Sequence, residues 1–290
     1  RLGLTPPVVS RLPGRTSAWE LDAGPAELVA IAEAADQLGY YHITCSEHVA
    51  IPVAVGPVRG ATYWDPLATL GYLAAKTQHL RLVTNVLVLA YHHPLAIAKR
   101  YGTLDRLSNG RVVLGLGVGS LVEEFELLGA PFADRGARAD DALRALRAAL
   151  GQREPSYSGP YYSFEGMIVD PWAVQERMPM WMGGRTRRSL RRAASLAEGW
   201  MPFALTTEEC AAMLATVDLP PGFEVVLTPD KALDPLARPE ETAAQLRAVA
   251  DAGATIVSVR PVHESLQHYL DQLAAFSELA EGSSSTGGAG

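Results

Sequence analysis

The chain of 290 residues is 48% hydrophobic and 20% charged, a composition typical of a globular protein that can bury a large core. Its formal net charge of −7 at pH 7 excludes a broad basic field, so we expect no binding to nucleic acid or to an anionic membrane surface. The sequence has no apolar run that would span a bilayer and no signal-peptide pattern at its start, which favours a cytoplasmic protein.

Short apolar segments alternate with segments of helical periodicity along almost the whole chain. The clearest unit joins two apolar runs, at 80–89 and 111–120, through a segment of helical composition, and this order forms a parallel crossover. The same alternation predicts eight strands, at residues 2–9, 40–45, 80–89, 111–120, 179–182, 200–204, 223–227 and 256–259. We therefore predict a single α/β domain over residues 1–281, a (β/α)8 TIM barrel.

Four segments do not follow this alternation. The loops at 11–25 and 51–63 are rich in proline and glycine and are long enough to contact a ligand. Residues 155–170 carry an alternating aromatic pattern, which predicts a hairpin inserted between two barrel units. Residues 282–290 are rich in serine and glycine, and we expect a flexible tail there.

Polar side chains stand at the ends of two predicted strands, where a barrel of this type binds its ligand. The amide of Asn85, followed by Val86, interrupts an apolar run, and it is either a hydrogen-bonded strand residue or a ligand contact. Glu47 and His48 leave the second strand together, and a carboxylate beside an imidazole can transfer protons near neutral pH. In the alternative interpretation His48 only anchors a loop.

Glycines end the fourth predicted strand. The segment contains Gly117, Val118 and Gly119, but the spacing of its glycines differs from the dinucleotide-binding fingerprint. We instead predict that the backbone approaches a planar or phosphorylated ligand closely at this point.

A second glycine-rich segment joins a predicted strand to the start of a helix. Gly183, Gly184 and Arg185 combine free backbone N–H groups, a helix dipole and a cation, which together suit a phosphate group. A purely structural turn between strand and helix is the other interpretation.

The remaining reactive residues do not form a complete constellation. Adjacent His92 and His93 point in opposite directions in an extended segment, and no third ligand has a suitable spacing, so we predict no metal site. Glu123 and Glu124 lie just beyond the fourth strand, where they face either the site or only water. Cys45 fits a small core residue better than a nucleophile.

Taken together, these motifs resemble those of the bacterial luciferase-like flavin and deazaflavin oxidoreductases. The block Leu-Asp-Arg-Leu-Ser-Asn-Gly-Arg at 104–111 is the most specific of them. The resemblance is greatest to the branch that uses coenzyme F420, a deazaflavin. It rests on residues 46–49, 84–87, 93–99, 103–111, 115–119, 179–184 and 193–200.

The resemblance implies a barrel whose cofactor ring lies against the end of the third strand. The family often has a non-prolyl cis peptide there, which corresponds to residues 85–86 in this chain. It also implies cofactor phosphate contacts at 183–184 and a role for His48 as a base. In the related sugar-phosphate dehydrogenases the acidic partner of that histidine falls at Ser120, which argues against glucose-6-phosphate oxidation.

From these observations we predict hydride transfer between coenzyme F420 and a small organic substrate. Residues 85–86 would brace the ring, Glu47 and His48 would position the substrate or shuttle a proton, and 183–185 would hold phosphate. The alternative is an FMN-dependent monooxygenase that uses O2 and receives reduced flavin from a partner reductase. A non-enzymatic ligand-binding barrel is the third possibility. A homodimer is expected from the resemblance alone.

Overall fold

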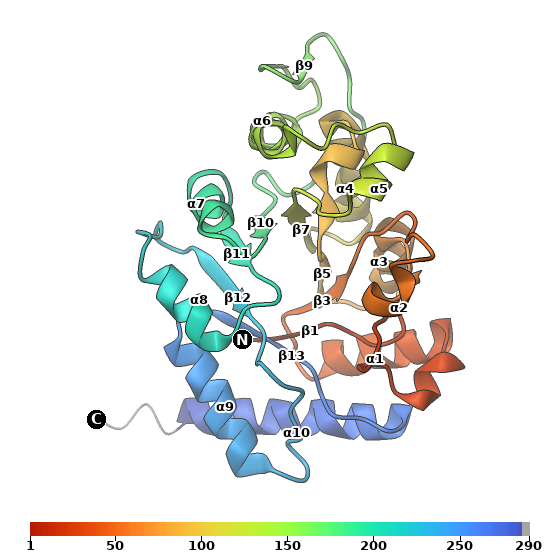
Figure 1. Cartoon of the computed structure of the whole chain (residues 1–290), viewed down its shortest axis with the longest axis vertical. Helices are drawn as coiled ribbons and strands as arrows, with labels where there is room; N and C mark the ends of the chain where they lie inside the picture. Colours follow the sequence, from red (N-terminus) through yellow and green to blue (C-terminus); the bar gives the residue numbers. More distant parts are fainter. Residues whose placement is uncertain (286–290) are drawn as a thin grey trace.

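Eight parallel strands close into a barrel in the computed structural model, which describes residues 1–285 (Figure 1). Each of these strands pairs with the next along the chain, and β13 pairs with β1 to close the ring. The predicted TIM barrel is therefore confirmed. Its strands are β1 (Leu2–Leu4), β3 (His42–Cys45), β5 (Arg81–Thr84), β7 (Val112–Gly117), β10 (Met180–Gly183), β11 (Gly199–Met201), β12 (Glu224–Leu227) and β13 (Ile256–Val259).

One long helix follows each barrel strand and covers the outside of the ring (Figure 1). The second of them begins at Pro66, where the Asp65 side chain accepts the Ala68 N–H at 2.8 Å and Pro66 occupies the first helical position. The long helices are α1 (Pro25–Gln37), α3 (Pro66–Ala74), α4 (Pro94–Leu107), α6 (Arg135–Ala149), α7 (Arg187–Leu196), α8 (Thr207–Leu214), α9 (Pro239–Asp251) and α10 (Leu266–Ser285). Short helical segments are η1 (Ala18–Leu21), α2 (Gly56–Arg59), η2 (Leu89–Tyr91) and α5 (Val122–Leu127).

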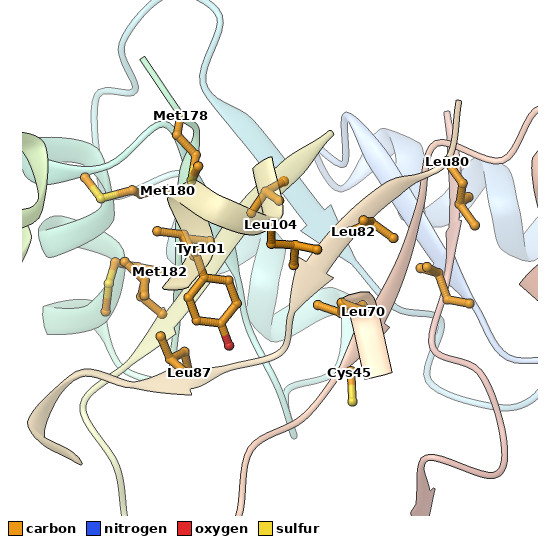
Figure 2. Packing of buried hydrophobic residues seen from close by; sticks show 14 of the residues in the cluster. Cys45, Leu70, Leu80, Leu82, Leu87, Tyr101, Leu104, Met178, Met180 and Met182 are labelled. Atoms are coloured by element: carbon orange, nitrogen blue, oxygen red, sulfur yellow. The ribbon is translucent and has the colours of Figure 1, made fainter. Parts of the chain in front are cut away.

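Alternate residues of the barrel strands serve two separate cores. Val83 and Trp181 belong to a small cluster of buried side chains from six of the barrel strands, with Tyr41 and Val86 packed against it. Leu82 and Met180 instead belong to the larger core between the strands and the helices. Figure 2 shows part of this larger core, with Tyr101 of α4 among side chains of the barrel. Strands with both faces buried explain why the sequence reads as uninterrupted apolar runs.

The specific block at 104–111 supports the fold rather than the ligand-binding rim. Arg111 is buried, and it donates to the carbonyl oxygens of Ala74 (2.8 Å), Thr77 (3.0 Å) and Leu80 (2.9 Å), which follow the end of α3 or lie in its last turn. The Asp105 carboxylate, also buried, accepts two backbone N–H groups of residues 174–175, each at 3.0 Å. These contacts fix the connections that precede β5 and β10.

Replacing Arg111 by leucine should destabilise the fold strongly. We expect Arg111→Leu to lower the free energy of unfolding by about 3 kcal/mol, because it leaves buried carbonyl oxygens without donors. Urea unfolding followed by circular dichroism measures the change. Arg187→Leu is the matched control, since Arg187 is exposed and should cost less than about 0.5 kcal/mol. Equal losses in the two variants would contradict this account of the block.

The structure differs from the sequence-based elements at the long third strand. The predicted run at 80–89 is divided, because β5 ends at Thr84 and β6 (Leu87–Val88) resumes against the end of β7. The predicted hairpin at 155–170 is confirmed by the antiparallel pair β8 (Tyr157–Ser158) and β9 (Ser163–Phe164).

Two segments predicted as separate parts of the chain meet on the ligand-binding rim. Strand β2 (Ser10–Arg11) pairs in antiparallel fashion with β4 (Thr62–Tyr63), so the loops at 11–25 and 51–63 share a small sheet. Sequence periodicity had indicated no strand in either loop, because two-residue strands are too short to produce a pattern.

The end of the chain also differs from the prediction. Helix α10 runs to Ser285, so it includes 282–285, the first four residues of the predicted tail. Extending an existing helix by a turn costs far less than starting one, even for serine and glycine. Residues 286–290 lie outside the described part of the chain. Within the described part, no helix combines the length and the apolar composition needed to cross a membrane.

Candidate functional site

The predicted site residues meet at one rim of the barrel. Strands β3, β5, β7 and β10 are neighbours in that order, and their carboxyl ends lie at the same edge. The segments that follow them carry residues 47–48, 85–86, 117–119 and 183–185. This is the rim at which barrels of this class bind their ligands.

The peptide bond between Asn85 and Val86 is cis, as the resemblance implies. It lies between β5 and β6, and the Asn85 N–H donates to the carbonyl oxygen of Cys45 at 2.8 Å. Both residues are partly exposed, whereas their neighbours in β5 and β6 are buried. Backbone and side chain are therefore presented at the rim at this one point of the strand.

Glycines on two neighbouring segments make room for the side chain of Val86. A Cβ atom on Gly117 would lie 2.5 Å from Val86 Cγ2, and one on Gly183 would lie 2.7 Å from Val86 Cγ1. Both distances are shorter than any ordinary carbon contact, so only glycine fits at these positions without displacing Val86. The position of Val86 at the rim thus depends on residues of β7 and β10.

The close approach predicted at 117–119 involves protein side chains in this structure. Gly119 has φ +78°, and a Cβ atom there would lie 2.4 Å from the ring of Phe125 in α5. Val118 is partly buried and packs against the outer core. Packing alone accounts for these glycines, and their predicted contact with a ligand stays a prediction.

Glu47 has the contacts of an anchoring residue. It is buried, its Oε2 accepts the N–H of Val88 at 2.6 Å, and its Oε1 lies 2.6 Å from Nε2 of His92. Both carboxylate oxygens are therefore engaged with the segment that follows β5. This arrangement favours positioning of the rim over the proton transfer or substrate contact predicted for Glu47.

The sequence alone left open whether Glu124 faces the site or water. In the structure its side chain is buried and contacts the ring of His48. Glu124 is only 1% exposed, and its Oε2 lies 2.9 Å from His48 Nδ1. Oε1 accepts the N–H groups of Val49 (2.5 Å) and Ala50 (3.2 Å). An ionised carboxylate has no proton to give, so Nδ1 of His48 is the donor in this pair.

A tyrosine completes the surroundings of this carboxylate. The Tyr91 hydroxyl lies 2.9 Å from Glu124 Oε2, and burial, together with this hydrogen bond, raises the pKa of Tyr91 above its ordinary value. Tyr91 is therefore protonated at neutral pH and donates this hydrogen bond to Glu124. Glu124 accepts from segments that follow β3 and β5 while it follows β7 itself, so it joins three strand ends.

The second ring nitrogen of His48 is available for chemistry. Because Nδ1 carries the proton that Glu124 accepts, Nε2 of a neutral His48 holds a lone pair. Nε2 has no hydrogen-bond partner within residues 1–281, the part of the chain whose side chains are described. The ring packs edge-on against Tyr63 at 4.5 Å between centroids, and its side chain is 21% exposed. This geometry is that of a positioned base with an accessible acceptor.

The turn at 183–185 leads into a capped helix. Gly184 has φ +126°, a conformation that favours glycine, and Thr186 begins α7 by accepting the Ser189 N–H at 3.2 Å. The side chain of Arg185 is exposed, with its guanidinium 6.0 Å from the ring centre of Phe203. A cation and a helix N-terminus thus lie together at the rim, an arrangement that suits an anion.

The remaining candidates have structural contacts. His92 binds Glu47, whereas the His93 ring nitrogen accepts the Leu95 N–H at 3.2 Å at the start of α4. Within residues 1–285, no group of three or more His, Cys, Asp or Glu side chains could hold a metal ion. Burial raises the pKa of the Cys45 thiol to about 12, so it is a core residue rather than a nucleophile.

The fold and the rim define a parallel α/β barrel with a histidine–carboxylate pair at the strand ends. The model of the family described as luciferase-like monooxygenase matches residues 7–220. The chain belongs to this family of oxidoreductases and monooxygenases, as the sequence motifs had indicated.

Individual relatives agree with this assignment. The chain is 32% identical over 185 residues to an uncharacterized protein of Mycobacterium tuberculosis, a match that covers 59% of this chain and 66% of the relative. It is 29% identical over 181 residues to the F420-dependent glucose-6-phosphate dehydrogenase of Microbacterium testaceum, covering 61% of this chain and 52% of that protein. These matches thus span between half and two thirds of the relatives' own length.

A solved structure supports the fold over a longer stretch. The monooxygenase RslO1 from Streptomyces bottropensis superposes with a TM-score of 0.74 at 20% identity, and the alignment covers 97% of this chain and 99% of that one. At this identity the similarity supports the barrel architecture and not the reaction.

Proposed function

We propose that the protein is an oxidoreductase that moves a hydride between coenzyme F420 and a small organic substrate. The observation that carries the proposal is the His48–Glu124 pair, at 2.9 Å, on the same rim as the cis peptide at 85–86. The F420-dependent relative from Microbacterium testaceum supports the choice of cofactor.

The residues of the rim fit a flavin-like cofactor. Asn85 and Val86, held in place by glycines of β7 and β10, would lie against its ring, and Gly183, Gly184 and Arg185 would hold its phosphate. A bound deazaflavin supplies a ring carbon that accepts or donates a hydride.

The protein's own contribution is proton transfer and positioning. Glu124 fixes the imidazole of His48 so that Nε2 can accept a proton from a substrate hydroxyl, or return it. Glu47 acts indirectly. Its carboxylate binds Val88 and His92, and it thereby holds the segment that carries His48 against the segment that follows β5. Ser120, which stands where related sugar-phosphate dehydrogenases have an acid, accepts a hydrogen bond from Arg59 at 3.4 Å.

Titration with each cofactor tests the proposal. We expect micromolar binding of oxidised F420, followed by the change in its fluorescence, and at least tenfold weaker binding of FMN. Tight binding of FMN without a response to F420 would refute the proposal and favour the flavin-dependent monooxygenase, with a partner reductase as supplier. Failure of both cofactors to bind would favour a non-enzymatic barrel. Sedimentation of the same samples tests the homodimer that is expected from the family resemblance.

A further inference from the structure

A groove runs along the outside of the barrel between α6 and α7. Two hollows of about 500 Å³ and 540 Å³ adjoin there, because Arg144, Ser195 and Leu196 line both. Both helices start at the ligand-binding rim and end at the opposite side of the barrel, since each follows a parallel strand. The groove is therefore separate from the strand ends, but it begins beside them.

The groove is basic in a chain whose net charge is −7. Its only acidic residues, Asp140 and Glu198, are already engaged by arginines that also line it. The ion pairs join Arg192 to Asp140, and Arg147 and Arg177 to Glu198. The other arginines in the lining are Arg144, Arg188 and Arg191, and all three are exposed.

These three arginines have no carboxylate partner within residues 1–281, where side chains are described. Arg144 donates only to the backbone carbonyl oxygen of Asp140, at 3.2 Å. Arg188 and Arg191 lie one helical turn apart on α7 and face Arg144 across the groove. An anionic chain lying between α6 and α7 would pass the guanidinium groups of these three arginines.

The position of Arg188 connects this groove to the proposed cofactor site. It is the second residue of α7 and comes four positions after Gly184, where the cofactor phosphate is proposed to bind. Gly136, in the first turn of α6, lines the groove at this end, and its carbonyl oxygen accepts a hydrogen bond from Arg192 at 3.1 Å. A chain that extends from the phosphate would therefore reach the groove at the end where α6 and α7 begin.

We propose that the groove binds a chain of carboxylates attached to the cofactor phosphate. The inference rests on the proposed function and deepens it, because F420 carries glutamate residues beyond its phosphate whereas FMN ends at the phosphate. Guanidinium groups bind carboxylates through paired N–H donors, and Arg144, Arg188 and Arg191 supply them. Exposed pairs of this kind are individually weak and sensitive to salt.

The test compares full-length F420 with F420 truncated at its phosphate. The variant R144Q/R188Q/R191Q should bind full-length F420 about tenfold more weakly than the wild type at low ionic strength, and bind the truncated form unchanged. Added salt should remove most of the difference. The control R153Q/R238Q/R247Q removes the same charge from exposed arginines elsewhere and should bind both forms like the wild type.

The outcomes separate this inference from the proposed function. Equal affinity of the wild type and the groove variant for full-length F420 would overturn the inference and leave the cofactor proposal intact. If the wild type binds neither form of F420, the proposed function fails, and the groove is then tested alone with γ-linked tetraglutamate by calorimetry. Binding of tetraglutamate to the wild type but not to the groove variant would support the groove as an oligocarboxylate site. If tetraglutamate does not bind to the wild type, the inference is overturned.

Discussion

Glu124→Gln should lower kcat by about a hundredfold or more while the protein stays folded. The glutamine oxygen would still accept the hydrogen bonds from the N–H groups of Val49 and Ala50. Its NH2 group would then face Nδ1 of His48 and donate to it. A neutral His48 would then carry its proton on Nε2 and lose its lone pair at the rim. General-base catalysis contributes about 10²–10⁴-fold, so the loss of the correct tautomer should remove much of that factor.

Steady-state kinetics over a range of pH, with F420 and its substrate, measures this effect. The neighbouring Glu123→Gln is the matched control, because Glu123 is exposed and should leave kcat within about twofold. A positioning role predicts that Glu124→Gln lowers kcat much more than it changes KM, and that it alters the pH profile. An unchanged pH profile with normal kcat would rule out the His48–Glu124 pair as the acid–base centre.

Gly183→Ala should weaken cofactor binding by about tenfold or more. The new methyl group would lie 2.7 Å from Val86 Cγ1, and Val86 must then move away from the position it holds at the cis peptide. Overpacking of this kind costs about 1–3 kcal/mol, and the cofactor ring would lose the surface against which it is proposed to lie. Fluorescence titration measures the affinity, and thermal unfolding measures the loss of stability.

A double-mutant cycle isolates the contact. Val86→Ala removes both Cγ atoms, so adding Gly183→Ala in that background should cost much less stability than it does in the wild type. The interaction energy should be about 1 kcal/mol or more in favour of the double variant. Additive losses would show that Gly183 is required for a reason other than room for Val86.

The barrel could be predicted from sequence because its strands are buried on both faces. Runs such as β7 and β13 are apolar at almost every position, and they were predicted within a few residues. The cis peptide at 85–86 was expected only from the family resemblance, and the end of β5 at Thr84 was not predicted, since apolar residues stand on both sides of it. The pairing of β2 with β4 joins residues about 50 positions apart and has no local signal.

The site was also predicted only in part, because strand ends have a local sequence signal and contacts between distant segments have none. Strand ends could be located, so residues 47–48, 85–86 and 183–185 were correctly expected at one rim. The partner of His48 could not be identified, because His48 and Glu124 are 76 positions apart and only the closed barrel brings them together. Glu47, which was predicted to position the substrate or shuttle a proton together with His48, instead accepts from Val88 and contacts His92.

The small sheet of β2 and β4 affects how the rim can change without loss of the barrel. Its two strands belong to different loops, and Tyr63 of β4 also packs on the ring of His48. Transplanting either loop alone from another family member would leave an unmatched backbone edge and disturb the packing of the base. The two loops therefore form one exchangeable unit, and redesign of substrate preference should replace them together.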